Sequence, residues 1–310
     1  MPVPDEDGRT PAPDLIDAQR RDPLDEAVPM GVLLPAALAT MYARAENTFS
    51  TPTGFQELDT LLGGGLSPGT LTVVASRPSM GTSSLLLHLC RVTAFRRRRP
   101  VVLAGYQMPG HELALRLLSA ETSVPLGELR AGTMGLDDSA RVVRRTAELA
   151  GAPLSVITPA GWTATHLTSY IADLSTDEKF ELVVVDGLDD VRPWPSDESR
   201  DPPVTEAARA LKELAMELKV PVVAGAQLGG RPEERADRRP GPLTDFRRPD
   251  AVGHIADVVI MVHREDAYEP GSSRAGEADL IVAKHRHGPK ATVTVTFEER
   301  YGRFADPSVS

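Results

Sequence analysis

The chain has 310 residues, of which 41% are hydrophobic, 25% charged and 5% aromatic, and its formal net charge is −10. These proportions are typical of a globular protein. Every apolar run breaks well short of the roughly 20 residues that cross a bilayer. The sequence therefore excludes a membrane-spanning helix, and we expect a cytoplasmic protein with no membrane partner. The single cysteine, Cys90, excludes an internal disulfide framework and a cysteine-based zinc site.

The acidic excess is distributed unevenly along the chain. Residues 1–30 contain eight acidic and three basic residues together with six prolines, and so hold half of the net charge. Such a composition predicts a disordered, acidic and proline-rich tail. Basic clusters lie farther along, at 96–99, 231–248 and 284–290. A basic cluster is usually a solvated surface, but this uneven distribution means that the net charge does not exclude a nucleic-acid partner.

The rest of the chain alternates apolar runs with helix-length segments. Residues 32–46 have the spacing of a short amphipathic helix, which we assign to a linker or docking segment over residues 31–50. The expected strands are 71–75, 101–105, 154–157, 182–186, 220–226, 258–262, 279–283 and 292–297. The expected helices after the linker are 82–95, 110–122, 137–150, 164–174 and 204–218. This order predicts an α/β fold with a mostly parallel sheet, helices on both faces and an antiparallel C-terminal edge.

The segment after the strand at 71–75 has the order of a nucleotide phosphate site, in which a strand, a tight loop and a helix N-terminus follow one another. It reads Ser76-Arg77-Pro78-Ser79-Met80-Gly81-Thr82-Ser83-Ser84. Compared with the phosphate-loop pattern GxxxxGK(S/T), it keeps Gly81 and the hydroxyl of Ser83. Ser76 stands in place of the first glycine, and Thr82 in place of the lysine. On this pattern alone, an ordinary strand-to-helix turn is an equal alternative.

Further motifs in the right order make the chain resemble the RecA-like motor domain of the DnaB family of replicative DNA helicases, over about residues 53–304. The motifs that carry the resemblance are Thr53-Gly54-Phe55, Arg77-Pro78-Ser79-Met80-Gly81, Met108-Pro109, Leu182-Val183-Val184-Val185-Asp186, Gln227-Leu228, Arg235-Ala236-Asp237-Arg238-Arg239-Pro240, Asp245-Phe246-Arg247 and Lys284-His285-Arg286-His287-Gly288-Pro289. The resemblance implies a RecA-like P-loop NTPase core over residues 51–305 and a short tail at 306–310. It also leads us to expect that the family's helical domain ahead of the motor is absent.

The resemblance implies a role for each matching residue. ATP and Mg²⁺ would be bound by Arg77, Pro78, Ser79, Met80, Gly81, Thr82, Ser83, Ser84 and Asp186, with Ser83 and Asp186 holding the metal. Gln227 would sense the γ-phosphate, while Lys284 and Arg286 would reach the ATP of a neighbouring subunit. Single-stranded DNA would be bound by Arg231, Arg235, Arg238, Arg239, Arg247 and Arg248. The implied assembly is a homo-oligomeric ring, hexameric by family analogy, or a hetero-oligomer with an intact paralogue.

Two departures from the family concern hydrolysis. Thr82 lacks the positive charge of the family's lysine. Gln107 stands where the family has its catalytic glutamate, and an amide cannot take a proton from the attacking water. We therefore expect ATP hydrolysis to be weakened. Arg77, Asp189 and Asp190 are candidates to compensate, although nothing in the sequence positions them.

Three functions are compatible with these residues. The first is an ATP-dependent DNA helicase with an unconventional nucleotide site. The second is a catalytically inactive helicase paralogue that serves as a DNA-binding or regulatory, accessory subunit. A third and weaker interpretation is a recombinase-like RecA relative, suggested by the run Leu61-Leu62-Gly63-Gly64-Gly65-Leu66.

Overall fold

The computed structural model describes residues 28–45, 49–192, 203–229, 239–240, 249–269 and 271–307. Most of the tail predicted at 1–30 lies outside these residues. So do five of the six arginines predicted to bind DNA, namely Arg231, Arg235, Arg238, Arg247 and Arg248. Among the described residues, no helix combines the length and the hydropathy that crossing a bilayer requires.

The chain divides into two compact units, residues 1–43 and 44–310. Helix α1 (Met30–Ala45) makes up most of the described part of the first unit, and its bounds are close to those of the helix predicted at 32–46. Pro35 lies inside this helix, where proline has no N–H to donate to the carbonyl of Gly31 four residues earlier. The exposed residues of α1 include large apolar side chains, namely those of Val32, Leu33, Leu34, Leu38, Met41 and Tyr42.

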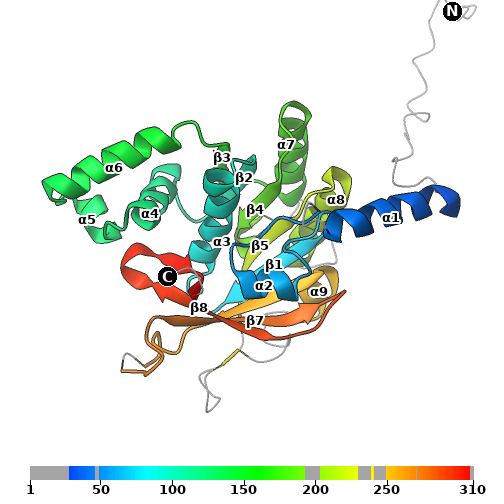
Figure 1. Cartoon of the computed structure of the whole chain (residues 1–310). Helices are drawn as coiled ribbons and strands as arrows, with labels where there is room; N and C mark the ends of the chain where they lie inside the picture. The colour runs from blue at the N-terminus through cyan, green and yellow to red at the C-terminus, as the bar shows by residue number, and fades with distance from the viewer. Residues whose placement is uncertain are drawn as a thin grey trace, which may run out of the picture. The chain divides into compact units, whose positions relative to one another are not determined.

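Within the described residues, the second unit is built on a nine-stranded sheet with the strand order β3-β2-β4-β5-β1-β6-β7-β8-β9 (Figure 1). The strands are β1 (Leu71–Ser76), β2 (Val101–Gly105), β3 (Leu154–Ile157), β4 (Leu182–Asp186), β5 (Val222–Gln227), β6 (Val258–His263), β7 (Glu277–His285), β8 (Thr292–Glu298) and β9 (Arg303–Ala305). The pairs from β3 to β6 are parallel, and those from β6 to β9 are antiparallel. The predicted parallel sheet with an antiparallel C-terminal edge is thereby confirmed.

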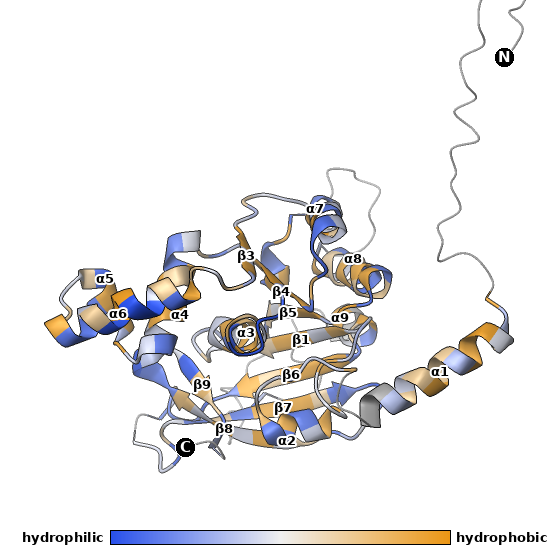
Figure 2. Cartoon of the chain, turned by 45° about the horizontal axis from the view of Figure 1, so that its top comes forward, coloured by the Kyte–Doolittle hydropathy of each residue, from blue (hydrophilic) through white to orange (hydrophobic). Residues whose placement is uncertain are grey.

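Helices cover both faces of this sheet, as the sequence predicted. They are α2 (Gln56–Leu61), α3 (Thr82–Cys90), α4 (Gly110–Thr122), α5 (Leu126–Ala131), α6 (Leu136–Leu149), α7 (Ala164–Asp177), α8 (Pro203–Leu218) and α9 (Pro249–Ile255). Side chains of α2, α3 and α4 join one apolar core, and those of α7, α8 and α9 join a second. Successive residues of β1 alternate between them, because neighbouring side chains of a strand point to opposite faces. Figure 2 shows the hydrophobic colour concentrated in the central strands.

Several details of the second unit differ from the prediction. The helix expected at 82–95 continues from α3 as a π-helical segment, Arg91–Arg96. Strand β5 begins two residues later than expected, because Pro221 has no N–H for a ladder and Lys219 has a φ of 56°. The sequence did not predict the short helices α2, α5 and α9, which have six or seven residues each, or the strand β9, which has three. Segments this short show too little periodicity in hydrophobicity to be recognised.

The sheet brings several strand ends to one edge. In the parallel pairs, Gly105 of β2 lies opposite Asp186 of β4, and Ser76 of β1 lies opposite Gln227 of β5. The carboxyl ends of parallel strands are where open α/β sheets bind ligands. This edge is therefore the place to look for a functional site.

Candidate nucleotide-binding site

The loop between β1 and α3 has the backbone of a phosphate loop. Gly81 precedes the first residue of α3 and has a φ of 105°, and Ser79 two residues earlier has a φ of 68°. A Cβ built on Gly81 would lie 3.1 Å from the ring of Phe304. Position 81 thus needs glycine for its conformation and for its close approach to β9. The first residues of α3, Thr82, Ser83 and Ser84, line a cavity, and the first N–H groups of a helix are suited to bind an anion, although the lysine of the pattern is missing.

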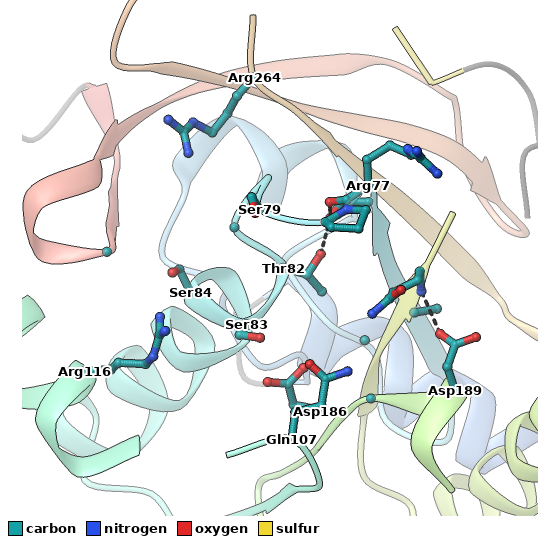
Figure 3. A pocket seen from close by; sticks show the side chains of 18 of the residues that line it. Arg77, Ser79, Thr82, Ser83, Ser84, Gln107, Arg116, Asp186, Asp189 and Arg264 are labelled. Atoms are coloured by element: carbon teal, nitrogen blue, oxygen red, sulfur yellow. Dashed lines mark hydrogen bonds between the residues drawn. The ribbon is translucent and has the colours of Figure 1, made fainter. Parts of the chain in front are cut away.

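A cavity of about 360 Å³ lies over the loop and the ends of β2, β4 and β5 (Figure 3). It brings together most of the predicted site, namely Arg77, Pro78, Ser79, Gly81, Thr82, Ser83, Ser84, Gln107, Asp186 and Gln227. Met80 is the exception among the predicted loop residues: it is buried and does not line the cavity. The side chain of Met80 therefore supports the loop from within the fold.

Ser83 and Asp186 face each other at the floor of the cavity. Burial raises the pKa of Asp186, and a hydrogen bond from Ser83 acts in the opposite direction. The charge of Asp190 raises this pKa further, whereas Arg116 lowers it. A hydroxyl beside a buried carboxylate is an oxygen-only donor set, which suits Mg²⁺. The two residues predicted to hold magnesium thus fit that ion.

The two departures from the phosphate-loop pattern contact each other. The Ser76 and Thr82 hydroxyl oxygens are 2.5 Å apart, and the Ser76 hydroxyl also lies 2.8 Å from the carbonyl oxygen of Arg77. Because Ser76 has a single hydroxyl proton and directs it to that carbonyl, Thr82 is the donor in the first bond. The Thr82 side chain is therefore turned back across the loop (Figure 3). Position 82 supplies the cavity with a neutral side chain engaged by its own loop.

The structure positions the two carboxylates that the sequence alone left unplaced. Both follow β4 in a short 3-10 turn, Leu188–Asp190, and both line the cavity. The side-chain amide of Gln107 donates to Asp190 at 2.7 Å. The backbone N–H of Gln227 donates to Asp189, also at 2.7 Å. Gln107 thus lies beside a carboxylate of another element, and the predicted sensor Gln227 is tied to the same turn.

Two arginines that sequence reasoning missed also line the cavity. Arg116 comes from α4, and its Nε lies 3.1 Å from Glu112. Arg264 follows β6; its side chain is buried, stacks over Phe297 at 4.1 Å and pairs with Asp266 at 3.1 Å. Arg264 could have been found, because it follows a parallel strand at the same edge as Asp186. No comparable signal marks Arg116, whose side chain reaches the cavity from a helix.

Lys284 and Arg286, predicted to act on a neighbouring subunit, do not line the cavity of their own chain. The ammonium of Lys284 donates to the backbone carbonyls of Gly253, His254 and Ala256, at 2.6–3.1 Å, and burial lowers its pKa. The guanidinium of Arg286 lies 3.0 Å from Asp257. Their action on a neighbour stays a prediction.

Of the arginines predicted to bind DNA, only Arg239 lies among the described residues. Its guanidinium pairs with the buried Asp279 of β7. Its role toward DNA also stays a prediction.

The mostly parallel sheet, the phosphate-loop backbone and the cavity above the ends of its strands define a RecA-like nucleotide-binding fold. Residues 50–306 match the family described as the DnaB-like helicase C terminal domain. The chain belongs to this family.

Curated relatives and solved structures agree with this assignment. The chain is 43% identical over 255 residues to the replicative DNA helicase DnaB of Leifsonia xyli, covering 82% of this chain and 55% of that protein. It is 40% identical over 224 residues to the DnaB of Mycobacterium leprae, covering 72% of this chain and 37% of that protein. The chain therefore spans about half or less of these relatives. A DnaB-like replicative helicase, whose solved structure also concerns its interactions with primase, superposes with a TM-score of 0.81 at 26% identity, covering 91% of this chain and 68% of that one.

Proposed function

We propose that this chain binds ATP with Mg²⁺ in the cavity above the phosphate loop and hydrolyses it slowly. The observation that carries the proposal is the pairing of Ser83 with the buried Asp186 beside the N-terminus of α3. Magnesium held there would neutralise charge on the β- and γ-phosphates. Thr82 offers no cation and Gln107 no basic group, so hydrolysis is expected to be slower than in a site with lysine and glutamate.

Titration with a fluorescent ATP analogue, with and without magnesium, tests this proposal. We expect wild-type protein to bind the analogue more tightly with magnesium, and Asp186→Asn to lose that dependence. Asp177→Asn, an exposed carboxylate at the end of α7, is the matched control and should bind like wild type. Wild-type protein that binds no nucleotide in the presence of magnesium would refute the proposal.

We propose further that the chain binds single-stranded DNA through the arginines at 231–248. Support comes from the density of arginine in this segment and from the family to which the chain belongs. Contacts from arginine to phosphate weaken as salt rises, because bound counterions are released. Binding to a labelled oligothymidine should therefore fall with salt, and Arg235→Ala should weaken it while Lys179→Ala does not. Binding that is insensitive to Arg235→Ala, Arg238→Ala and Arg247→Ala together would refute this assignment.

The oligomeric state we propose is a ring of copies of this chain, with α1 docking on a neighbouring copy. Its exposed side chains, Leu34, Leu38 and Met41 among them, support the proposal because they form an apolar surface that a partner could cover. Light scattering should give a mass of several copies with nucleotide bound, and Leu34→Ser with Leu38→Ser should lower it. A monomeric mass for the wild-type protein with nucleotide bound would contradict the ring.

A second candidate function is an accessory subunit in a hetero-oligomer with an intact paralogue. Lys284 and Arg286 match the family motif but do not line the nucleotide cavity of their own chain. This placement favours a role toward a partner's ATP. The ATPase rate of a mixture with an intact relative tests this candidate, with Arg286→Ala against the exposed control Lys290→Ala. An unchanged rate with Arg286→Ala would refute it.

A further inference from the structure

We infer that Asp190 takes over the proton-accepting role of the glutamate that Gln107 replaces. This inference rests on the proposed binding of ATP in the cavity. It starts from one contact: the side-chain amide of Gln107 donates a hydrogen bond to Asp190 at 2.7 Å. A carboxylate therefore lies within one hydrogen bond of the side chain that stands at the family's glutamate position. The two come from different elements, Gln107 from the end of β2 and Asp190 from the turn after β4.

The surroundings of Asp190 favour a role in the cavity over a role in packing. Asp190 is exposed and lines the same cavity as Ser83 and Asp186. Its charge raises the pKa of the buried Asp186 and contributes to raising that of Tyr106, whose main cause is burial. The carboxylate is thus electrostatically coupled to the floor of the site.

The backbone leaves room for this arrangement. Residue 187 is glycine, and a Cβ built there would lie 3.4 Å from a carboxylate oxygen of Asp190. A larger side chain at 187 would compete with Asp190 for this space. The neighbouring carboxylate, Asp189, accepts from the backbone N–H of Gln227 and so stabilises the end of β5 instead. Of the two, Asp190 is the one placed beside Gln107.

The chemistry balances without a further reactant. As the oxygen of a water molecule bonds to the γ-phosphorus of ATP, the bond from that phosphorus to the β–γ bridging oxygen breaks, and ADP leaves with the electron pair. The proton lost by the water passes to the Asp190 carboxylate, and inorganic phosphate is released. Gln107 holds the carboxylate through its amide and accepts no proton itself. A positioned base contributes roughly 100-fold or more to such a step.

A reciprocal exchange of the two side chains gives the sharpest test. Asp190→Asn should lower magnesium-dependent ATP turnover by about 100-fold. The double variant Gln107→Glu with Asp190→Asn keeps one amide and one carboxylate in contact but reverses their places, and should recover at least tenfold of that loss. Asp177→Asn is the control, and the thermal midpoint of each variant reports whether it has folded. Affinity for the fluorescent ATP analogue, measured in parallel, should stay within about twofold of wild type for all variants.

The outcomes separate this inference from the proposed function. Turnover by Asp190→Asn within threefold of wild type overturns the role of Asp190, as does a double variant as slow as Asp190→Asn. A loss of nucleotide affinity in Asp190→Asn also overturns it, because Asp190 would then be part of the binding site. Wild-type protein that binds the analogue without turning ATP over overturns the inference but leaves the binding proposal standing. Wild-type protein that binds no nucleotide refutes the proposed function itself.

Discussion

The phosphate loop and the carboxyl end of β7 differ in what they have kept. The loop has the backbone of a nucleotide site, with Gly81 in a left-handed conformation, but position 82 is threonine where the GxxxxGK(S/T) pattern has lysine. The end of β7 keeps both cations of its motif, Lys284 and Arg286, which bond to the end of α9 and to Asp257. The phosphate loop thus has the expected backbone without the expected cation. The end of β7 has both expected cations, but each is bonded to groups of its own chain. A phosphate-loop backbone therefore does not by itself supply the charged side chain of the pattern.

The largest expected effect is a loss of stability on replacing Asp257, the buried carboxylate that pairs with Arg286. Asp257 is buried and accepts from Leu71 N–H at 2.9 Å and from Lys212 at 2.8 Å, besides pairing with Arg286. Asp257→Asn leaves these cations without their counter-charge, which should cost about 3 kcal/mol of unfolding free energy. Urea unfolding measures this, with the exposed Asp173→Asn as control. A loss below about 1 kcal/mol would mean that the anchor contributes no more than a surface pair.

The next largest expected effect is a loss of nucleotide affinity on replacing Gly81 of the phosphate loop. Gly81→Ala forces a side chain into a positive φ and against Phe304, at a cost of about 1–3 kcal/mol. If this cost falls on the binding step, it corresponds to a roughly 5- to 150-fold loss of affinity for magnesium and the ATP analogue. The control Gly127→Ala places its Cβ in open space and should bind like wild type. Unchanged affinity in Gly81→Ala would show that the loop conformation is not what binds phosphate.

A smaller effect concerns pH and the helix that carries the loop. His88 of α3 is buried, stacks on Phe55 at 4.2 Å, and burial lowers its pKa to about 3. The unfolded chain takes up a proton at this residue below about pH 6.5 while the folded chain does not, so stability should fall as pH drops from about 6.5 toward 3. The slope from this residue is at most about 1.4 kcal/mol per pH unit. In His88→Phe, unfolding free energies measured between pH 7 and 4.5 should fall less steeply; an identical slope would exclude His88 as the cause.

The sequence predicted the sheet well for a physical reason. Buried parallel strands such as β2 and β4 are continuous apolar runs, and the residues that end them mark the functional edge. Asp186 and Gln227, which the family resemblance predicted, are such strand-end residues, and the same rule would have added Arg264. What pattern reasoning could not predict are contacts that depend on the shape of a loop. The hydrogen bond between Ser76 and Thr82 is of this kind, because it requires the loop to fold back on itself.

The position of Asp190 illustrates the same limit. Its distance from Gln107 depends on the 3-10 turn at 188–190 and on the pairing of β2 with β4, which lie some eighty residues apart in the chain. A sequence read in order places these residues in separate motifs. Met80 shows the converse: it belongs to the motif by position, but its side chain packs inward and contributes nothing to the lining of the cavity.

We expect this site to bind magnesium and ATP but to turn ATP over slowly, because position 82 supplies no cation. ATP turnover by Thr82→Lys, measured with magnesium and single-stranded DNA, tests it most directly, with the neutral and similarly sized Thr82→Val as control. We expect Thr82→Lys to be at least about tenfold faster than wild type, since one preorganised donor is worth several kcal/mol in the transition state. Thr82→Val should show no gain. If Thr82→Lys turns ATP over no faster than wild type, the missing cation is not the cause of slow turnover.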